Sequence, residues 1–351
     1  MSERKTALVV GATGVIGGSL IKHLEGLEDW DTVGVCRRPP GHGGRTQYIS
    51  IDLSEPVSGE EHLAAMSGVT HIFYAGYTDR PTFAEQTAPN TALFVNAVEA
   101  FEPRARNLAH ICLVQGSKYY GRHLGPFRTP AKEDDARHMP PNFYFDQQDF
   151  LAARQQGKRW TWSCARPQTV AGAALGGPLN MISVIAVFAA ISKELGLPLR
   201  FPGNSKCYGA IFQVTDADLL AKALVWMATE PRCAGQAFNI ANGDVFRWEN
   251  TWPKIAAYFG MQAGPVHTIS LAEMMADKDA LWLAMVEKYG LRPGGLEEIV
   301  NWRFGDYLFS NEWDVMMDTI KCREHGFTEF IDTEKMFLAH FEALRRDGVI
   351  P

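Results

Sequence analysis

The feature that most constrains the fold is a glycine pattern directly after a short apolar run. The chain reads Ala7-Leu-Val-Val-Gly11-Ala-Thr-Gly14-Val-Ile-Gly17, which predicts a buried strand, a turn and the start of a helix. The first glycine permits a tight turn, the second lets the backbone approach a pyrophosphate, and the third allows close helix packing. The helix N-terminus then faces the phosphates. A turn without a ligand is the alternative, but this strand-turn-helix context favours dinucleotide binding.

The first half of the chain alternates short apolar runs with helical patterns, as a doubly wound parallel sheet of the Rossmann type requires. Strands are expected at Ala7 to Val10, Thr32 to Cys36, His71 to Tyr74, His110 to Gln115 and Trp160 to Ala165. Helices are expected at Ile16 to Leu27, Glu61 to Met66 and Thr91 to Phe101, where apolar residues recur every three or four positions. Such helices would cover both faces of the sheet.

The pattern changes from Pro178 onward. A long apolar helix, Met181 to Leu195, is followed by a Gly/Pro-rich passage and by helices that contain Trp and Met. We therefore expect a dinucleotide-binding domain over residues 1–175 and a smaller, mainly helical substrate cap over 176–351. A segment near 210–245, with a strand at Gln236 to Ile240, is expected to return to the sheet.

Composition excludes several classes of protein. The net charge of -6 gives no global attraction for nucleic acid or anionic membranes. The six cysteines are widely spaced and form no metal-ligand pattern with histidine, so reduced thiols and no metal are expected. The N-terminus leads straight into a short strand, without a secretory signal or membrane span, which predicts a cytoplasmic protein.

Two arginines stand where the cofactor's ribose is usually recognised. About twenty residues after the glycines, NAD-binding proteins place an acid, whereas this chain has Arg37 and Arg38. Two guanidiniums would bind a 2′-phosphate through charge-assisted hydrogen bonds, which predicts NADP(H). Two solvated surface arginines are the alternative. Asp52 and Leu53 follow the next strand, where a side chain can reach the adenine, although Asp52 is equally explained as a turn residue.

The catalytic motif of short-chain dehydrogenases, Tyr-x-x-x-Lys, has no convincing copy. Instead Lys118 follows one strand in Gly116-Ser-Lys-Tyr-Tyr-Gly, and Tyr144 opens a later helix in Pro141-Asn-Phe-Tyr-Phe-Asp-Gln-Gln-Asp149. Four residues past Tyr144 stands Gln148, which cannot replace the lysine.

These segments resemble the progesterone 5β-reductase and iridoid synthase family, which moves the lysine to a K-H-Y-x-G-P-like segment and keeps the tyrosine in N-F-Y-Y-x-x-E-D. Further matches are Arg166-Pro167, the run Phe238-Asn-Ile-Ala-Asn-Gly-Asp244 with Trp248, and Phe304-Gly-Asp306. The chain departs from the pattern in the longer segment after Lys118, in Phe145, and in Gln148.

The resemblance implies that Lys118 and Tyr144 form the catalytic pair and that NADPH delivers hydride to the β-carbon of an activated alkene. The expected cofactor contacts are Gly11, Thr13, Gly14, Val15, Ile16, Gly17, Arg37, Arg38, Asp52, Leu53, Arg166, Pro167 and Val170. Arg166-Pro167 would meet the nicotinamide carboxamide, with a simple structural turn as the alternative. A solvated loop lysine and an aromatic helix anchor remain the alternatives for Lys118 and Tyr144.

To reduce an enone, the protein has to position the reacting groups and stabilise the negative charge that develops. A phenol at the carbonyl oxygen stabilises the enolate charge that develops in the transition state. A cap rich in Met, Phe, Ile and Trp suits a small apolar carbonyl substrate. The rival functions are carbonyl reduction, sugar epimerisation or dehydration, and a catalytically silent NADP(H) sensor.

The segments Thr91 to Phe101 and Asn142 to Ala153 predict a homodimer, because related folds pack such helices across a two-fold axis.

Overall fold

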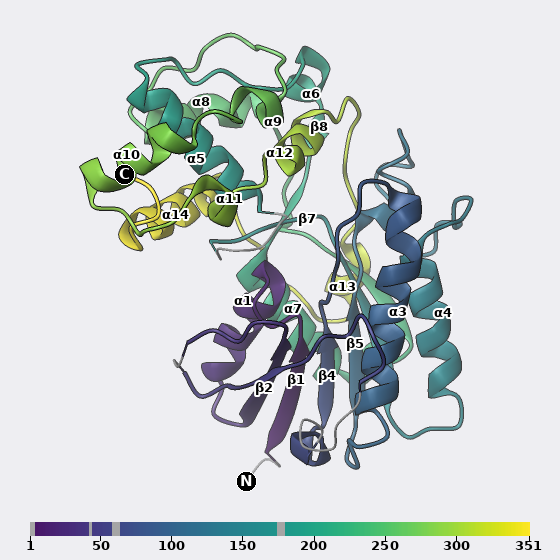
Figure 1. Cartoon of the computed structure of the whole chain (residues 1–351). Helices are drawn as coiled ribbons and strands as arrows, with labels where there is room; N and C mark the ends of the chain where they lie inside the picture. The colour runs from purple at the N-terminus through teal and green to yellow at the C-terminus, as the bar shows by residue number, and fades with distance from the viewer. Residues whose placement is uncertain (1–3, 42–43, 58–63, 174–179) are drawn as a thin grey trace.

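A seven-stranded parallel sheet forms the base of the protein in the computed structural model, which describes residues 4–41, 44–57, 64–173 and 180–351 (Figure 1). The strand order is β10-β6-β5-β4-β1-β2-β3. The strands are β1 (Lys5–Val10), β2 (Trp30–Cys36), β3 (Gln47–Ser50), β4 (His71–Tyr74), β5 (His110–Val114), β6 (Thr161–Pro167) and β10 (Gln236–Ile240). The order reverses between β1 and β4, which is where doubly wound sheets bind their ligands.

Helices cover both faces of this sheet (Figure 1). On one face α1 (Val15–Glu25) and α7 (Ala217–Thr229) pack in a single apolar cluster with Ala7 and Val9 of β1. On the other face Leu8 and Val10 share a cluster with α3 (Phe83–Phe101), and α4 (Phe143–Gln155) adds Leu151. The continuous apolar run of β1 follows from this burial on both faces.

A mainly helical cap lies over the carboxyl ends of the strands (Figure 1). Its larger helices are α5 (Met181–Glu194), α8 (Trp248–Tyr258), α10 (Asp279–Tyr289), α12 (Trp302–Phe309) and α14 (Thr333–Arg346). Its shorter elements are α6 (Ser205–Gly209), α9 (Leu271–Met274), α11 (Leu296–Ile299) and the paired strands β8 (Ile211–Phe212) and β11 (Phe246–Arg247). Nearly every residue of α5 is buried, because the rest of the cap packs around it.

The two halves of the chain are interleaved. As predicted, β10 returns to the sheet and pairs with β6. The helix α7 and the short helix α13 (Ile320–Glu324) also pack on the sheet side, the latter against β10. Between the halves, β7 (Thr169–Ala171) pairs with β9 (Val214–Asp216). The predicted boundary at residue 175 lies outside the described residues.

The predicted elements differ from the structure at a few positions. The expected helix Glu61 to Met66 lies partly outside the described residues, and its described part belongs to a 3₁₀ helix, Ala64–Gly68. The helix expected from Thr91 begins at Phe83, because Thr82 and Glu85 form a capping box ahead of it.

All six cysteines are free and buried. No helix in the described part of the chain has the length and apolar character needed to cross a membrane.

Candidate active site

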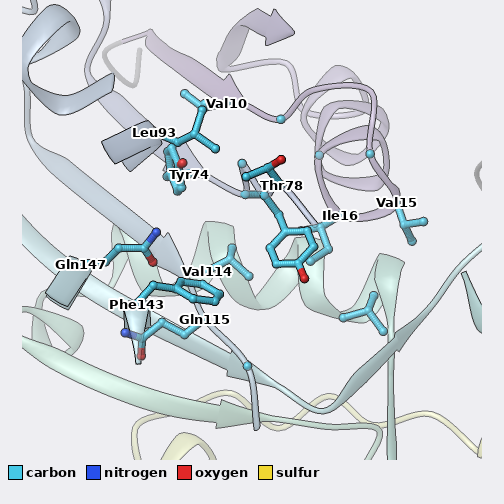
Figure 2. A pocket seen from close by; sticks show the side chains of 18 of the residues that line it. Val10, Val15, Ile16, Tyr74, Thr78, Leu93, Val114, Gln115, Phe143 and Gln147 are labelled. Carbon is cyan, nitrogen blue, oxygen red and sulfur yellow. The ribbon is translucent and has the colours of Figure 1, made fainter. Parts of the chain in front are cut away.

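A cleft of about 660 Å³ opens at the carboxyl ends of the central strands, beneath the cap. The last residues of five strands line it: Val10, Cys36, Tyr74, Val114 and Pro167. Figure 2 shows Val15 and Ile16 of α1 on one side and Phe143, Gln115 and Gln147 on the other. The cleft therefore spans the sheet from the glycine turn to α4.

The glycine turn forms one end of this cleft. Gly11 has a φ of +83°, and an added Cβ would lie 2.7 Å from the carbonyl oxygen of Ala75. A Cβ on Gly17 would strike the Gly11 carbonyl, so both positions need glycine for the fold itself. Gly14 differs, because it has ordinary extended backbone and an added Cβ would meet only the Gly11 oxygen, at 3.5 Å. The protein leaves room there for a ligand to approach the backbone.

The first turn of α1 borders the same space. Thr13, Val15 and Ile16 line the cleft, and no side chain in the described part of the protein caps the helix. The N–H groups of a first helical turn lack partners within the helix and attract anions. This end of the cleft can therefore hold a phosphate.

The structure separates the two predicted arginines. Arg37 and Arg38 are both exposed, but Arg37 lines the cleft beyond β2 and Arg38 does not. Asp52 and Leu53 line the cleft after β3. Asp52 accepts a hydrogen bond from the Ser54 N–H at 2.9 Å, which holds the pKa of its carboxyl below the usual value.

Lys118 stands on a 3₁₀ turn, Ser117–Tyr120, that follows β5. Its Nζ atom lies 5.4 Å from the centre of the Phe83 ring and 5.6 Å from that of Tyr307. Its pKa is lowered to about 8, chiefly by burial; the charge of Asp79 opposes this shift, and the charge of Arg122 contributes to it. A partly buried ammonium therefore faces the cleft.

Tyr144 lies in the first turn of α4 and lines the cleft with Lys118. The side chain of Asn142 caps α4 by accepting from the Tyr144 N–H at 3.0 Å. The hydroxyl lies 3.2 Å from the place where a Cβ on Gly116 would stand, two residues before Lys118. Burial, and secondarily Tyr307, raises the pKa of the Tyr144 phenol, so the group stays protonated near neutral pH.

Arg166 does not line the cleft, although Pro167 and Val170 do. Its guanidinium is buried and donates to Gln115 Oε1 at 3.0 Å and to Gln148 Oε1 at 3.1 Å. It also donates to the Tyr120 hydroxyl and to the carbonyl oxygen of Glu133, both at 3.1 Å. Gln115 in turn donates to the Tyr144 carbonyl oxygen at 2.9 Å. The geometry supports a role in positioning α4 and not in direct cofactor contact.

Several lining residues were not identified from the sequence: Ala75, Gly76, Tyr77, Thr78, Gln115, Ser117, Arg122, Gln168, Thr169, Phe304 and Tyr307. Most of them directly follow the end of a parallel strand. Because such sheets bind ligands at that position, the sequence could have indicated these residues. Phe304 and Tyr307 come from α12 of the cap, and no local pattern could have placed them here.

Comparison with known proteins is consistent with this geometry. Residues 53–351 match the model of the PRISE-like Rossmann-fold domain. The chain belongs to the PRISE family. An (S)-8-oxocitronellyl enol synthase of Nepeta racemosa is 36% identical over 98% of this chain and 93% of its own. The 3-oxo-Delta(4,5)-steroid 5-beta-reductase of Arabidopsis thaliana is 33% identical over 100% and 94%. A short chain dehydrogenase of Penicillium aethiopicum is 32% identical over 99% of each.

Solved structures share the fold of this PRISE protein at low sequence identity. The UDP-glucose 4-epimerase of Thermotoga maritima has a TM-score of 0.69 at 14% identity, over 97% of this chain and 99% of that one. A short-chain dehydrogenase/reductase from Agrobacterium tumefaciens with bound NAD has a TM-score of 0.66 at 14% identity, over 97% of each chain. The predicted family, fold and enzyme class are confirmed.

Proposed function

We propose that this PRISE protein uses NADPH to reduce the activated C=C bond of an enone or enal by 1,4-addition. One observation carries the proposal: Lys118 and Tyr144 line the same cleft as the glycine turn. The names of the relatives agree with such chemistry. Hydride addition to the β-carbon followed by protonation converts a 3-oxo-Δ4,5 steroid to its 5-reduced product, and the same two steps convert an enal to an enol.

NADP(H) fits the residues at the far end of the cleft. Gly14 leaves space beside the backbone that no protein atom fills, and the uncapped start of α1 borders it. Arg37 lines the cleft and would supply a cation to the 2′-phosphate. Asp52 and Leu53 would contact the adenine, and Pro167 and Val170 would contact the nicotinamide. When bound, NADPH supplies the hydride that adds to the β-carbon.

Tyr144 supplies the proton. Its phenol donates a hydrogen bond to the substrate's carbonyl oxygen, where negative charge grows as the alkene is reduced, and it then transfers its proton to that enolate oxygen, which gives the enol. Solvent restores the proton on the phenol oxygen, so each turnover takes up one proton and one hydride. Lys118 would hold the ribose of the bound cofactor, and its positive charge would favour loss of the phenol proton. The apolar rings of Phe143, Phe304 and Tyr307 border the cleft and limit the access of water.

The experiment follows NADPH oxidation with 2-cyclohexen-1-one and a linear enal, and identifies the products. A saturated carbonyl product supports the proposal, whereas an allylic alcohol would assign carbonyl reduction through the same tyrosine. Turnover of UDP-glucose without net NADPH consumption would assign an epimerase. Tight NADPH binding without any turnover would assign a silent sensor.

A homodimer and a cytoplasmic location remain predictions.

A further inference from the structure

A buried arginine, Arg122, stands near Lys118 and has no carboxylate counter-ion among the described residues. Arg122 is 4% exposed, lines the cleft and follows Lys118 by four residues. Its Nη1 atom donates to Gln168 Oε1 and to Thr169 Oγ1, both at 2.7 Å. Its Nε and Nη2 atoms are buried and have no hydrogen-bond partner among the described residues. No carboxylate in that part of the chain forms an ion pair with it or raises its pKa.

This arrangement destabilises the protein when no ligand is bound. A guanidinium keeps its charge in proteins, and burial of an unpaired charge is strongly unfavourable. The second unsatisfied group nearby is Gln168 Nε2, which is also buried without a partner. The Gln168 oxygen already accepts from Ser117 Oγ at 2.7 Å, from Arg122, and from the Thr169 N–H at 3.1 Å, which fixes the orientation of the amide. The unused groups of Arg122 and Gln168 are therefore donors, and their missing partner is an acceptor.

The position of Arg122 favours the substrate over the cofactor phosphates. Thr169, its hydrogen-bond partner, begins β7, and the residue after that strand, Gly172, packs against Val15 of α1. Three residues of extended chain, about 10 Å, thus separate Thr169 from the residue that contacts α1. The Arg122 Cζ atom instead lies 5.2 Å from the centre of the Phe212 ring and 5.8 Å from that of Tyr307.

Both of those rings belong to the cap, Phe212 through β8 and Tyr307 through α12. Arg122 also lies close enough to Lys118 to lower its pKa. The unused Nε and Nη2 donors are adjacent on one edge of a planar group, which matches the two oxygens of a carboxylate. Arg122 stands in the segment after Lys118 that departs from the family pattern.

We propose that Arg122, assisted by Gln168, binds a carboxylate on the substrate, so that the preferred substrate is an enone or enal bearing a carboxylate group. This inference rests on the proposed reaction, because it names the substrate class of the same cleft. It adds a specificity-determining residue to the chemistry of Tyr144 and Lys118.

The test compares linear enals that end in a free carboxylate with their methyl esters, at several chain lengths. The wild type should prefer the acid over the ester in kcat/KM by about tenfold to a hundredfold, as loss of a charge-assisted hydrogen bond implies. Arg122→Met should abolish that preference by raising KM for the acid, and Arg122→Lys should restore part of it. Arg128→Met is the matched control, because Arg128 lies six residues on, is exposed, and pairs with Asp135. It should keep the preference.

A second measurement separates this inference from the proposed reaction. The saturated acid and its ester are titrated into the protein with NADP⁺ by calorimetry, which requires no turnover. If neither enal is reduced, yet the acid binds the wild type and not Arg122→Met, the carboxylate site stands and the reaction is wrong. Equal acid and ester values in the wild type, or a rise in KM for NADPH as the main effect of Arg122→Met, would overturn the inference. Arg122→Gln replaces Arg122→Met if the latter does not fold.

Discussion

The side-chain amide of Asn142 donates a hydrogen bond to the carbonyl oxygen of Lys118 at 3.0 Å. The oxygen of the same amide accepts from the Tyr144 N–H at 3.0 Å, as the N-cap of α4. One side chain thus joins the backbone of the turn that carries Lys118 to the first turn that carries Tyr144. Asn142 therefore helps to fix the relative position of the two catalytic candidates.

Replacement of Asn142 should therefore impair turnover as well as stability. Asn142→Ala removes the cap and the link, and we expect the free energy of unfolding to fall by about 1–2 kcal/mol. We also expect kcat to fall about tenfold, since small misplacements of reacting groups are costly. Asn204→Ala removes the cap of α6, away from the cleft, and serves as the control. Equal kcat values for the two variants at a temperature where both are folded would contradict the positioning role.

The cofactor preference should depend on Arg37 more than on Arg38. Arg37 lines the cleft and Arg38 does not, so only the first is placed to contact a 2′-phosphate. Arg37→Ala should raise KM for NADPH about tenfold to a hundredfold and leave NADH little affected. Arg38→Ala should have a smaller effect on both. The measurement is steady-state kinetics with each cofactor, and an equal loss with NADPH and NADH would rule out phosphate recognition by Arg37.

Lys118 should impose an alkaline limit on activity. Its pKa is lowered to about 8, mainly by burial, so the ammonium is charged below that pH and becomes neutral above it. Because the proposed role requires the charge, kcat/KM should fall as the pH rises through about 8. The pKa of Tyr144 is raised well above this range, so the phenol does not produce the limit. Lys118→Arg should shift the fall to higher pH, and a profile unchanged by that substitution would assign the limit to another group.

Replacement of Arg166 can distinguish a role in positioning α4 from direct contact with the cofactor. Its buried guanidinium makes four hydrogen bonds, including one to Gln115, which holds the Tyr144 carbonyl. Arg166→Met should lower the free energy of unfolding by about 3 kcal/mol, since it leaves several buried acceptors unsatisfied. The Kd for NADPH, measured by fluorescence titration below the melting temperature, should change less than threefold, or about 0.6 kcal/mol. A large loss of NADPH affinity without loss of stability would restore the role predicted from the sequence.

Local patterns predicted the sheet because its strands and the glycine turn depend on local chemistry. The apolar sequence of β1 follows from its burial on two faces. The glycines after it follow from steric limits that few residues meet. Lys118 and Tyr144 were proposed through their resemblance to the family's motifs, and their catalytic role stays a prediction. Arg166 was misplaced because a sequence cannot say which way a residue at a strand end points. Tyr307 was missed because it reaches the cleft through the tertiary packing of the cap.

The decisive prediction concerns the hydroxyl of Tyr144. Tyr144→Phe keeps the ring and its packing against Phe143, so the fold and the affinity for NADPH should survive. What disappears is the donor to the developing oxyanion, whose loss in comparable sites costs about a hundredfold to a thousandfold in turnover. The effect should therefore fall on kcat, measured with an enal that the wild type reduces, while calorimetry reports an unchanged Kd for NADPH.

Lys118 and Tyr144 should act as a unit. Lys118→Met should lower turnover and, by releasing the ribose, weaken NADPH binding as well. The double variant should be little slower than the poorer single variant, because effects within one catalytic constellation are not additive. Near-wild-type turnover by Tyr144→Phe would refute the assignment. Tyr77 would then be the next candidate, because it lines the same cleft and lies close enough to Tyr144 for their charges to interact.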